Sequence, residues 1–254
     1  MTGGRGRDAG VALTVDGIEH RLDVSTYGSG DPAIVFVHDG LGSIRQWGDV
    51  PERAADASGR AVVAYNRSGH GTSLPVPRAA WPPDWMSREA IVLASVIEHC
   101  AAPPVRLVGH SDGGTIALLC ALARPDLVAG VVTLAAHSWV ERKCRDAIVA
   151  LRRDPERLIA ALARYHAHPA ALFEAWSGGW TNPDFATWDI RPRLGAISVN
   201  VIVVQGDRDE YATEEMATST AAAIGIGAEP MLVADCRHAV HRDRPDLVVE
   251  LAAR

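Results

Sequence analysis

A serine between glycines follows a short apolar stretch near the middle of the chain. Residues 105–114 are Val-Arg-Leu-Val-Gly-His-Ser-Asp-Gly-Gly, and a helix-like stretch, Thr115–Leu119, comes directly after them. A strand that passes through Gly-x-Ser-x-Gly into a helix is the pattern of a nucleophile elbow. Such a turn strains the serine backbone, exposes the hydroxyl and directs the first N–H groups of the helix towards an oxyanion. The spacing therefore predicts Ser111 as a nucleophile.

A serine hydroxyl needs a base, and the chain contains ten histidines. His238 lies in residues 235–245, between the last predicted strand and the last predicted helix. This position would place it on the same edge of the sheet as Ser111, as base catalysis requires. His241 is the alternative, but it is closer to the helix and fits a capping or packing role better. We predict His238 as the base.

The acid that orients the histidine should come between the serine and the histidine, after another strand. Asp207, Asp209 and Glu210 follow the apolar run 201–205. We favour Asp209, because it lies deeper in the loop and can turn back towards His238. Asp207 remains the main alternative, and each of these side chains could instead be a solvated carboxylate of a turn.

A glycine-containing turn, residues 37–43, follows the apolar run 33–37 and has the sequence Val-His-Asp-Gly-Leu-Gly-Ser. Backbone N–H groups in such a turn can bind an oxyanion opposite the serine. We predict that the N–H of Gly40 does so together with the N–H of Asp112. His38 could be a second base, but we expect a buried residue that fixes the loop by hydrogen bonds.

The elements that must position these residues follow from the hydrophobic pattern. Two alternating segments joined by Asp-Gly predict a hairpin, and six apolar runs predict buried strands. These eight segments are Val11–Val15, Ile18–Val24, Ala33–Val37, Ala61–Tyr65, Val105–Val108, Val131–Ala135, Val201–Gln205 and Met231–Ala234. Helix-like stretches lie between most of them, at Ile44–Ala57, Trp85–Cys100, Gly114–Ala123, Glu214–Ile224 and Pro245–Ala253. The alternation predicts an α/β fold with a mostly parallel eight-stranded sheet and helices on both faces.

One interval, residues 138–194, contains no strand pattern. Its helical segments are predicted at Arg142–Arg152, Pro155–His166 and Ala170–Trp176. We expect a helical lid here, inserted after the sixth strand, and a catalytic core formed by residues 1–137 and 195–254. The first ten residues are polar and glycine-rich, and we expect a loose tail there.

The inserted interval is rich in aromatic residues. It holds seven of the fourteen aromatic residues of the chain. One interpretation is a small subdomain that needs its own core. The other is a lid whose aromatic side chains line an apolar substrate pocket. On the second interpretation, the candidate substrate-binding residues are Trp139, Trp176 and Trp180.

Composition excludes several classes of function. The net charge of −6, with scattered basic residues, argues against a nucleic-acid partner. No stretch of about twenty apolar residues could span a membrane. The four cysteines are far apart, form no Cys-x-x-Cys pair and predict neither a disulfide framework nor a zinc site. With no secretory signal pattern at the start, we expect a cytoplasmic protein.

The predicted chemistry needs neither a metal nor an organic cofactor. Two histidine pairs, His166 with His168 and His238 with His241, could be considered for metal binding. Neither pair has a third ligand in view, so we predict no metal site.

The order of oxyanion loop, serine, acid and histidine resembles that of the α/β-hydrolase superfamily over nearly the whole chain. Residues 65–73, Tyr-Asn-Arg-Ser-Gly-His-Gly-Thr-Ser, look like the family's loop after the fourth strand, and residues 206–209 look like its acid turn. The spacing from His238 to Pro245 is similar to its final histidine segment. Within the superfamily, the motifs look closest to a group of small, uncharacterised bacterial hydrolases.

Two departures from the family pattern concern the oxyanion loop and the elbow. Asp39 stands where many relatives carry glycine, and Asp112 stands where Met, Leu or Gln is common. A carboxylate directed at the oxyanion would oppose the developing negative charge. We therefore expect the Asp112 side chain to point away from the site.

The resemblance implies a serine hydrolase that cleaves an ester or lactone of a small, largely apolar substrate through an acyl-enzyme. The same triad also occurs in hydrolases that cleave a carbon–carbon bond next to a ketone, and these are the nearest alternative. A slow-turnover ligand-binding protein with a lid as its switch is a third reading. The expected partner is a small-molecule substrate, and a homodimer is left open.

Overall fold

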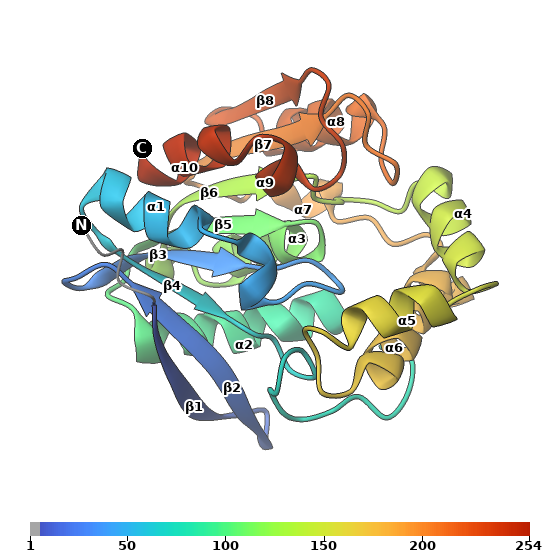
Figure 1. The fold of residues 1–254 in the computed structure, drawn as a ribbon. Coiled ribbons are helices and arrows are strands. Elements are labelled where there is room, and N and C mark those ends of the chain that lie inside the picture. Colours follow the sequence, from blue (N-terminus) through green and yellow to red (C-terminus); the bar gives the residue numbers. More distant parts are fainter. Residues whose placement is uncertain (1–5) are drawn as a thin grey trace.

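One eight-stranded sheet runs through the computed structural model, which describes residues 6–254 (Figure 1). The strand order is β1-β2-β4-β3-β5-β6-β7-β8. β1 and β2 are antiparallel, as are β2 and β4, and all later pairs are parallel. The strands are β1 Arg7–Val15, β2 Ile18–Tyr27, β3 Pro32–Val37, β4 Ala61–Tyr65, β5 Val105–His110, β6 Val128–Leu134, β7 Asn200–Gly206 and β8 Ala228–Val233. The predicted mostly parallel sheet is confirmed.

The entry hairpin forms where Asp-Gly predicts it. Asp16 and Gly17 both have positive φ, 50° and 76°, which a type I′ turn requires. The first strand is longer than expected, because Arg7 already pairs with Thr26 of β2. The expected loose tail is therefore wrong for residues 7–10, whose backbone is held by the neighbouring strand. Residues 1–5 of that tail lie outside the described residues.

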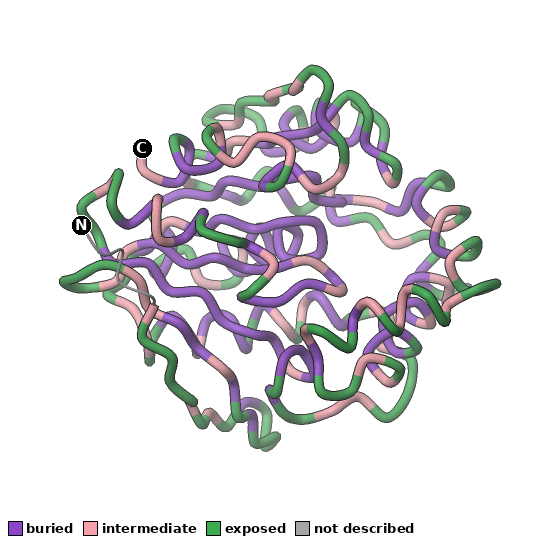
Figure 2. Tube along the Cα trace, in the orientation of Figure 1, coloured by how far each residue is buried: buried purple, intermediate pink, exposed green. Residues whose placement is uncertain are grey.

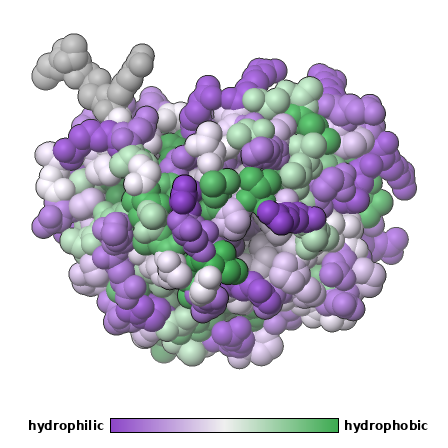
Figure 3. Space-filling model, turned by 90° about the horizontal axis from the view of Figure 1, so that it is seen from below, coloured by the Kyte–Doolittle hydropathy of each residue, from purple (hydrophilic) through white to green (hydrophobic). Residues whose placement is uncertain are grey.

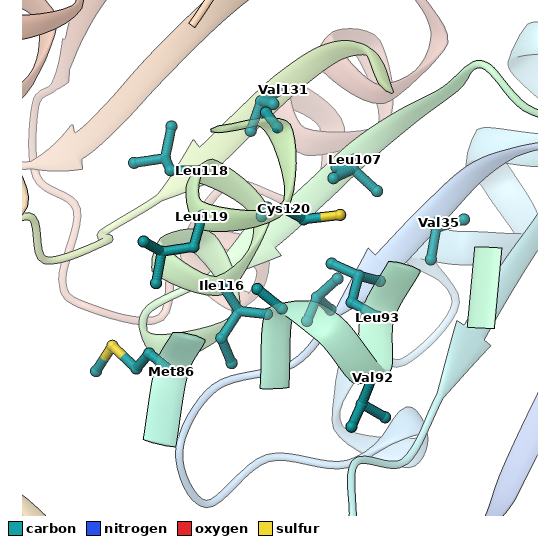
Figure 4. Packing of buried hydrophobic residues seen from close by; sticks show 14 of the residues in the cluster. Val35, Met86, Val92, Leu93, Leu107, Ile116, Leu118, Leu119, Cys120 and Val131 are labelled. Carbon is teal, nitrogen blue, oxygen red and sulfur yellow. The ribbon is translucent and has the colours of Figure 1, made fainter. Parts of the chain in front are cut away.

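Helices cover both faces of the sheet, and the buried parts of the chain form a continuous centre in Figure 2. α2 (Trp85–Cys100), α3 (Asp112–Ala123) and α8 (Glu214–Ile224) pack on one face, and α1 (Val50–Ser58) and α10 (Pro245–Ala253) pack on the other. α3 is buried from Asp112 to Ala121. Its Ile116 and Leu119 lie between the sheet and α2 (Figure 4). A helix that is apolar all round suits this central place.

The segment predicted as one helix, Ile44–Ala57, is divided. A single 3₁₀ turn, Ile44–Trp47, ends at Gly48, whose φ is 63°, and α1 begins at Val50. Pro51 lacks an N–H group and fits the first turn of a helix, where no intrahelical acceptor exists for it. The glycine and the proline thus end one element and begin the next.

The interval between β6 and β7 is helical, and we call residues 138–194 the inserted segment. It contains α4 (Arg142–Leu151), α5 (Glu156–Leu162), α6 (Pro169–Thr181), the 3₁₀ turn Pro183–Phe185 and α7 (Arg191–Leu194). α5 ends four residues before the predicted end, and α6 continues five residues beyond its predicted end. α4, α5 and α6 lie beyond the carboxyl ends of the strands (Figure 1).

Aromatic packing joins the inserted segment to the rest of the fold. The ring of Trp85, at the start of α2, lies 4.4 Å from that of Phe185 and 5.8 Å from that of Trp180. Trp180 and Phe185 are 1% and 0% exposed and belong to the same apolar cluster as the sheet. These aromatic side chains therefore extend the main core and do not form a separate one.

The remaining short elements are a 3₁₀ turn, Pro125–Leu127, and α9 (Val240–Asp243). No helix within residues 6–254 is both long and apolar enough to cross a membrane. The face shown in Figure 3 carries charged and polar side chains around smaller apolar areas.

Candidate active site

Ser111 lies at the sharp turn between β5 and α3. Its backbone has φ 51° and ψ −121°, and its N–H donates to the carbonyl oxygen of Leu134 at 2.8 Å. The flanking glycines allow the turn. A Cβ on Gly109 would lie 2.3 Å from the carbonyl oxygen of Gly113, and a Cβ on Gly113 would lie 2.1 Å from that of Val37. A positive φ at a non-glycine residue is the strained conformation expected of a nucleophile elbow.

His238 and Asp209 come together from two loops at the carboxyl ends of β7 and β8. Nδ1 of His238 lies 2.8 Å from Oδ2 of Asp209. The other oxygen, Oδ1, accepts the backbone N–H groups of Tyr211 and Ala212 at 2.7 and 3.1 Å. Gln205 donates its side-chain amide to Oδ2. These bonds hold the carboxylate in one orientation towards the imidazole.

The alternative acid is held elsewhere. Oδ1 of Asp207 accepts the backbone N–H of Cys236 at 3.2 Å, so this carboxylate fixes the loop that carries His238. The structure thus brings Asp209, and not Asp207, to the imidazole.

The pairing changes the pKa of both partners. Burial favours the neutral form of His238 and lowers its pKa, but the hydrogen bond and the negative charge of Asp209 outweigh burial, and the pKa is raised above 6.5. Burial raises the pKa of Asp209, and the hydrogen bond with His238 more than reverses this, so its pKa is lowered. Asp209 is therefore ionised, and the charge stabilises an imidazolium at His238.

Two other histidines occupy the supporting positions that the sequence suggests. His38 accepts the backbone N–H of Arg67 at Nε2 (3.0 Å), so its Nδ1 carries the proton and donates to the carbonyl oxygen of Asp39 at 2.8 Å. His241 is 6% exposed, and its ring lies 4.8 Å from that of Trp47 and 4.7 Å from that of His110. His38 therefore fixes the loop before Gly40, and His241 packs against the rings of Trp47 and His110.

A small cavity joins the predicted residues. We call it the inner cavity; it has a volume of about 80 Å³ and is lined by Asp39, Gly40, Leu41, Ser111, Asp112, His137, Cys144, Ile148, Trp176, Trp180, Tyr211 and His238. Gly40 and Asp112, the first residue of α3, both line it. The first N–H groups of a helix have no intrahelical acceptor, so they are available to an anion.

A wider groove adjoins the inner cavity. We call it the outer groove; its volume is about 380 Å³, and it shares Asp39, Leu41, Tyr211 and His238 with the inner cavity. Leu151, Leu158 and Leu162 of the inserted segment give it an apolar side. The two spaces therefore meet at His238.

The expected orientation of Asp112 is wrong. Its side chain is 1% exposed, lines the inner cavity and accepts a hydrogen bond from Nε1 of Trp180 at Oδ1 (3.2 Å). Oδ2 lies 2.7 Å from the point where a Cβ on Gly40 would stand. Burial raises the pKa of Asp112 to about 6, although the charge of Arg67 acts in the opposite direction. The carboxyl group is turned inwards because α6 places an indole donor beside it.

Of the three tryptophans predicted to bind the substrate, two line the inner cavity and one lies elsewhere. Trp176 and Trp180 line the inner cavity, and Trp139 does not. The guanidinium of Arg191 lies over the Trp139 ring, 4.8 Å from its centre, and the Trp139 backbone bridges to Asp189. Trp139 thus packs at the base of the inserted segment, away from the inner cavity.

Several lining residues were not singled out from the sequence. His137 follows β6 at the same carboxyl edge, a position that could have drawn attention to it, and burial lowers its pKa to about 4 with a further effect from His238. Cys144, Ile148 and Tyr211 carry no local signal for such a place.

Two more histidines support the oxyanion loop. Nε2 of His70 lies 3.0 Å from the carbonyl oxygen of Gly40. His166 accepts the N–H of Gly71 at Nδ1, so its Nε2 donates to the carbonyl oxygen of Leu41 at 3.1 Å. No group of three or more His, Cys, Asp or Glu side chains in residues 6–254 is arranged to hold a metal ion. His166 and His238 thus take part in hydrogen bonds of the loops around the cavity.

The chain is similar in sequence to proteins that are named as lipases. The chain is 35% identical over 103 residues to the sn-1-specific diacylglycerol lipase ABHD11 of Mus musculus, which is 41% of this chain and 32% of that protein. It is 29% identical over 166 residues to the lipase LipV of Mycobacterium tuberculosis, which is 64% of this chain and 57% of LipV. The chain thus spans about a third and just over half of the lengths of these two curated relatives.

A solved structure gives a match over nearly the full length. It is described as that of an N-acyl homoserine lactone degrading enzyme, with 25% identity, a TM-score of 0.70, and coverage of 95% of this chain and 98% of that one. A family model described as the alpha/beta hydrolase family matches residues 34–251. Together with the sheet order, the serine turn and the contact between Asp209 and His238, this match shows that the chain belongs to the α/β hydrolase family.

Proposed function

We propose that the protein is a serine hydrolase that cleaves a carboxylic ester or lactone of a small, largely apolar substrate. The observation that carries the proposal is the 2.8 Å contact between Asp209 and His238, because His238 lines the same cavity as Ser111. The lipases and the lactone-degrading enzyme among the similar proteins support this reaction class.

In the first half of the reaction, Oγ of Ser111 attacks the carbonyl carbon, and Nε2 of His238 takes its proton. Asp209 stabilises the imidazolium that forms. The negative charge that develops on the carbonyl oxygen is bound by the N–H groups of Gly40 and Asp112. The intermediate then collapses, the alcohol oxygen takes the proton from His238 as it leaves, and Ser111 keeps the acyl group.

In the second half, water replaces the alcohol. His238 takes a proton from the water molecule, the hydroxide oxygen attacks the acyl carbon, and the same two N–H groups bind the oxyanion. Collapse releases the carboxylic acid, and the proton returns to Oγ of Ser111. No group beyond those described is needed to balance the protons.

The two spaces suggest how a substrate lies. The inner cavity, with Ile148, Trp176 and Trp180 on its wall, holds a short acyl group, since a volume of about 80 Å³ equals that of roughly two to three water molecules. The outer groove takes the alcohol part along Leu151 and Leu158. On this proposal the inserted segment acts as a lid that contributes walls to both.

The test is covalent labelling together with ester turnover. A fluorophosphonate should label Ser111 stoichiometrically, as located by peptide mass spectrometry, and p-nitrophenyl acetate should give a burst of p-nitrophenol. Ser111→Ala should abolish both while circular dichroism shows an unchanged fold. Absence of labelling and of turnover in the wild-type protein would exclude the serine hydrolase. Turnover of vinylogous diketones, but not of esters, would favour the carbon–carbon hydrolase instead.

A further inference from the structure

Four buried polar atoms of the residues that line the inner cavity lack a hydrogen-bond partner among residues 6–254. They are the two ring nitrogens of His137, Oδ2 of Asp112 and Nε1 of Trp176. Two of them lie close to Gly40, because a Cβ placed on Gly40 would lie 2.7 Å from Oδ2 of Asp112 and 2.1 Å from Nε1 of Trp176. Oδ2 of Asp112 and Nε1 of Trp176 therefore lie on the same side of Gly40.

The two atoms have complementary chemistry. A carboxylate oxygen only accepts hydrogen bonds, and an indole N–H only donates them. Buried polar groups without partners cost folding free energy, and native proteins leave few of them. An unpaired acceptor and an unpaired donor on the same side of Gly40, on residues that line the cavity, therefore indicate a place for a ligand group that can satisfy both.

The neighbouring residues fix Asp112 without using this oxygen. Trp180 holds Oδ1 at 3.2 Å. The positive charge of Arg67 lowers the pKa of Asp112. The guanidinium of Arg67 donates a hydrogen bond to the carbonyl oxygen of Asp39 at 2.8 Å. Asp39 and His238 are the other charged or titratable groups that act on Asp112. Oδ2 is thus held in place without a hydrogen-bond partner of its own.

A hydroxyl group is the small substituent that fits this pair. It can donate to Oδ2 of Asp112 and accept from Nε1 of Trp176. An ammonium group would satisfy Asp112 but has no lone pair for the indole N–H, a carboxylate would be repelled by Asp112, and a methyl group would satisfy neither. The choice of substituent therefore follows from the donor and acceptor count.

We propose that Asp112 and Trp176 recognise a hydroxyl group on the acyl part of the substrate, so that the enzyme prefers esters of short hydroxy acids. The position of the group rests on the proposed function, in which the N–H of Gly40 binds the carbonyl oxygen. A hydroxyl beside Gly40 then belongs to a carbon close to the scissile carbonyl. The small inner cavity limits the acyl chain to a few carbons.

The experiment uses three methyl esters with the same branched skeleton: lactate, isobutyrate and alaninate, which carry a hydroxyl, a methyl and an amino group at one position. Values of kcat/KM at pH 7 are each divided by the rate constant of hydroxide hydrolysis, which removes differences in intrinsic reactivity. We expect wild-type protein to prefer one enantiomer of the lactate over the isobutyrate by about 10-fold or more, and also over the alaninate.

Two variants test the pair separately. Asp112→Asn presents an amide in place of the free oxygen, and Trp176→Phe removes the indole N–H while keeping an aromatic ring. Each should reduce the preference for lactate over isobutyrate to near unity. Trp176→Phe is the conservative change, so it keeps the test decisive where Asp112→Asn fails to fold, and thermal melting checks both.

The outcomes separate this inference from the proposed function. Equal corrected rates for lactate and isobutyrate, in a protein that labels at Ser111, would overturn only the hydroxyl site and leave a cavity that holds water. A preference for alaninate would overturn it in favour of a cation site. If the wild-type protein shows no turnover, ligand-observed NMR can still compare the binding of the two esters to the Ser111→Ala variant. Tighter binding of methyl lactate than of methyl isobutyrate there would support the hydroxyl site, and equal binding would overturn it.

Discussion

Lys143 donates from Nζ to the backbone carbonyl oxygen of Asp209 at 2.5 Å and to that of Ala212 at 2.9 Å. Lys143 is the only lysine in the chain and lies in α4, at the start of the inserted segment. Beside it, Glu141 accepts the N–H and the hydroxyl of Thr213. The inserted segment therefore holds the loop that carries the acid of the Asp209–His238 pair.

This contact predicts that Lys143→Met reduces kcat with little change in KM. In this variant the carbonyl groups of Asp209 and Ala212 lose their hydrogen bonds to the ammonium group, so the loop is held less firmly. We expect a decrease in kcat of roughly 10-fold. The acid limb of the pH profile should also move to lower pH, since a displaced Asp209 raises the pKa of His238 less. Lys143→Arg should recover part of both effects. A pH profile that stays in place would mean that Lys143 supports only stability.

The two aspartates of the acid loop should differ sharply in a matched pair of variants. Asp209→Asn removes the charge that stabilises the imidazolium, and we expect kcat to fall by roughly 10³- to 10⁴-fold. Asp207→Asn keeps an acceptor for the N–H of Cys236 and should change kcat by less than about 10-fold. Steady-state hydrolysis of p-nitrophenyl acetate measures both. A greater loss in Asp207→Asn would contradict the assignment.

The raised pKa of His238 predicts the pH dependence of activity. Only neutral His238 can accept the proton of Ser111, so kcat/KM should rise with pH through a midpoint above 6.5. In Asp209→Asn the midpoint should fall, because burial then acts without the opposing charge. A wild-type midpoint below 6.5 would contradict the pairing.

The same shift has a consequence for stability with a definite sign. Folding raises the pKa of His238, so the folded chain binds this proton more tightly than the unfolded chain. The resulting stabilisation is fully present below pH 6.5 and is lost as the pH rises through the folded-state pKa. An NMR titration of His238 checks the pKa directly, and thermal melts of wild type and His238→Ala across this window should converge towards high pH.

The two tryptophans of the inner cavity should respond differently to truncation. Trp180 is 1% exposed and packs against Trp85 and Phe185, so Trp180→Ala should cost about 3–5 kcal/mol in the free energy of unfolding. Trp176 is 8% exposed and lines the cavity beside Gly40, so Trp176→Ala should chiefly admit longer acyl chains. Urea unfolding and a series of p-nitrophenyl esters from acetate to octanoate measure the two effects. Equal unfolding costs for both variants would argue against this division.

Much of the fold was predictable because parallel strands leave a strong pattern. Continuous apolar runs indicate strands covered on both faces, and the loops after their carboxyl ends meet on one edge. That rule alone brings Ser111, Asp209 and His238 to the same edge. The order of the strands in the sheet was not predicted, since no short pattern encodes which parallel strands are neighbours.

The details that were missed depend on contacts between distant parts of the chain. Asp112 turns inwards because Trp180, 68 residues later, donates to it. α6 continues through Gly178 and Gly179, although glycine disfavours helices. The helix packs closely against Ala80 and Trp81 there, since a Cβ on these two glycines would approach them to 2.7 and 3.1 Å. Local sequence propensity cannot predict these contacts, because the contacting residues are far away in the sequence.

The shared aromatic packing of Trp85, Trp180 and Phe185 bears on how this scaffold can be re-engineered. An exchange of residues 138–194 for the corresponding stretch of another hydrolase would remove two members of the cluster and leave the third, at the start of α2, facing a mismatched surface. A functional chimera would have to transplant the beginning of α2 together with the inserted segment. The natural unit of exchange in this molecule is therefore discontinuous in sequence.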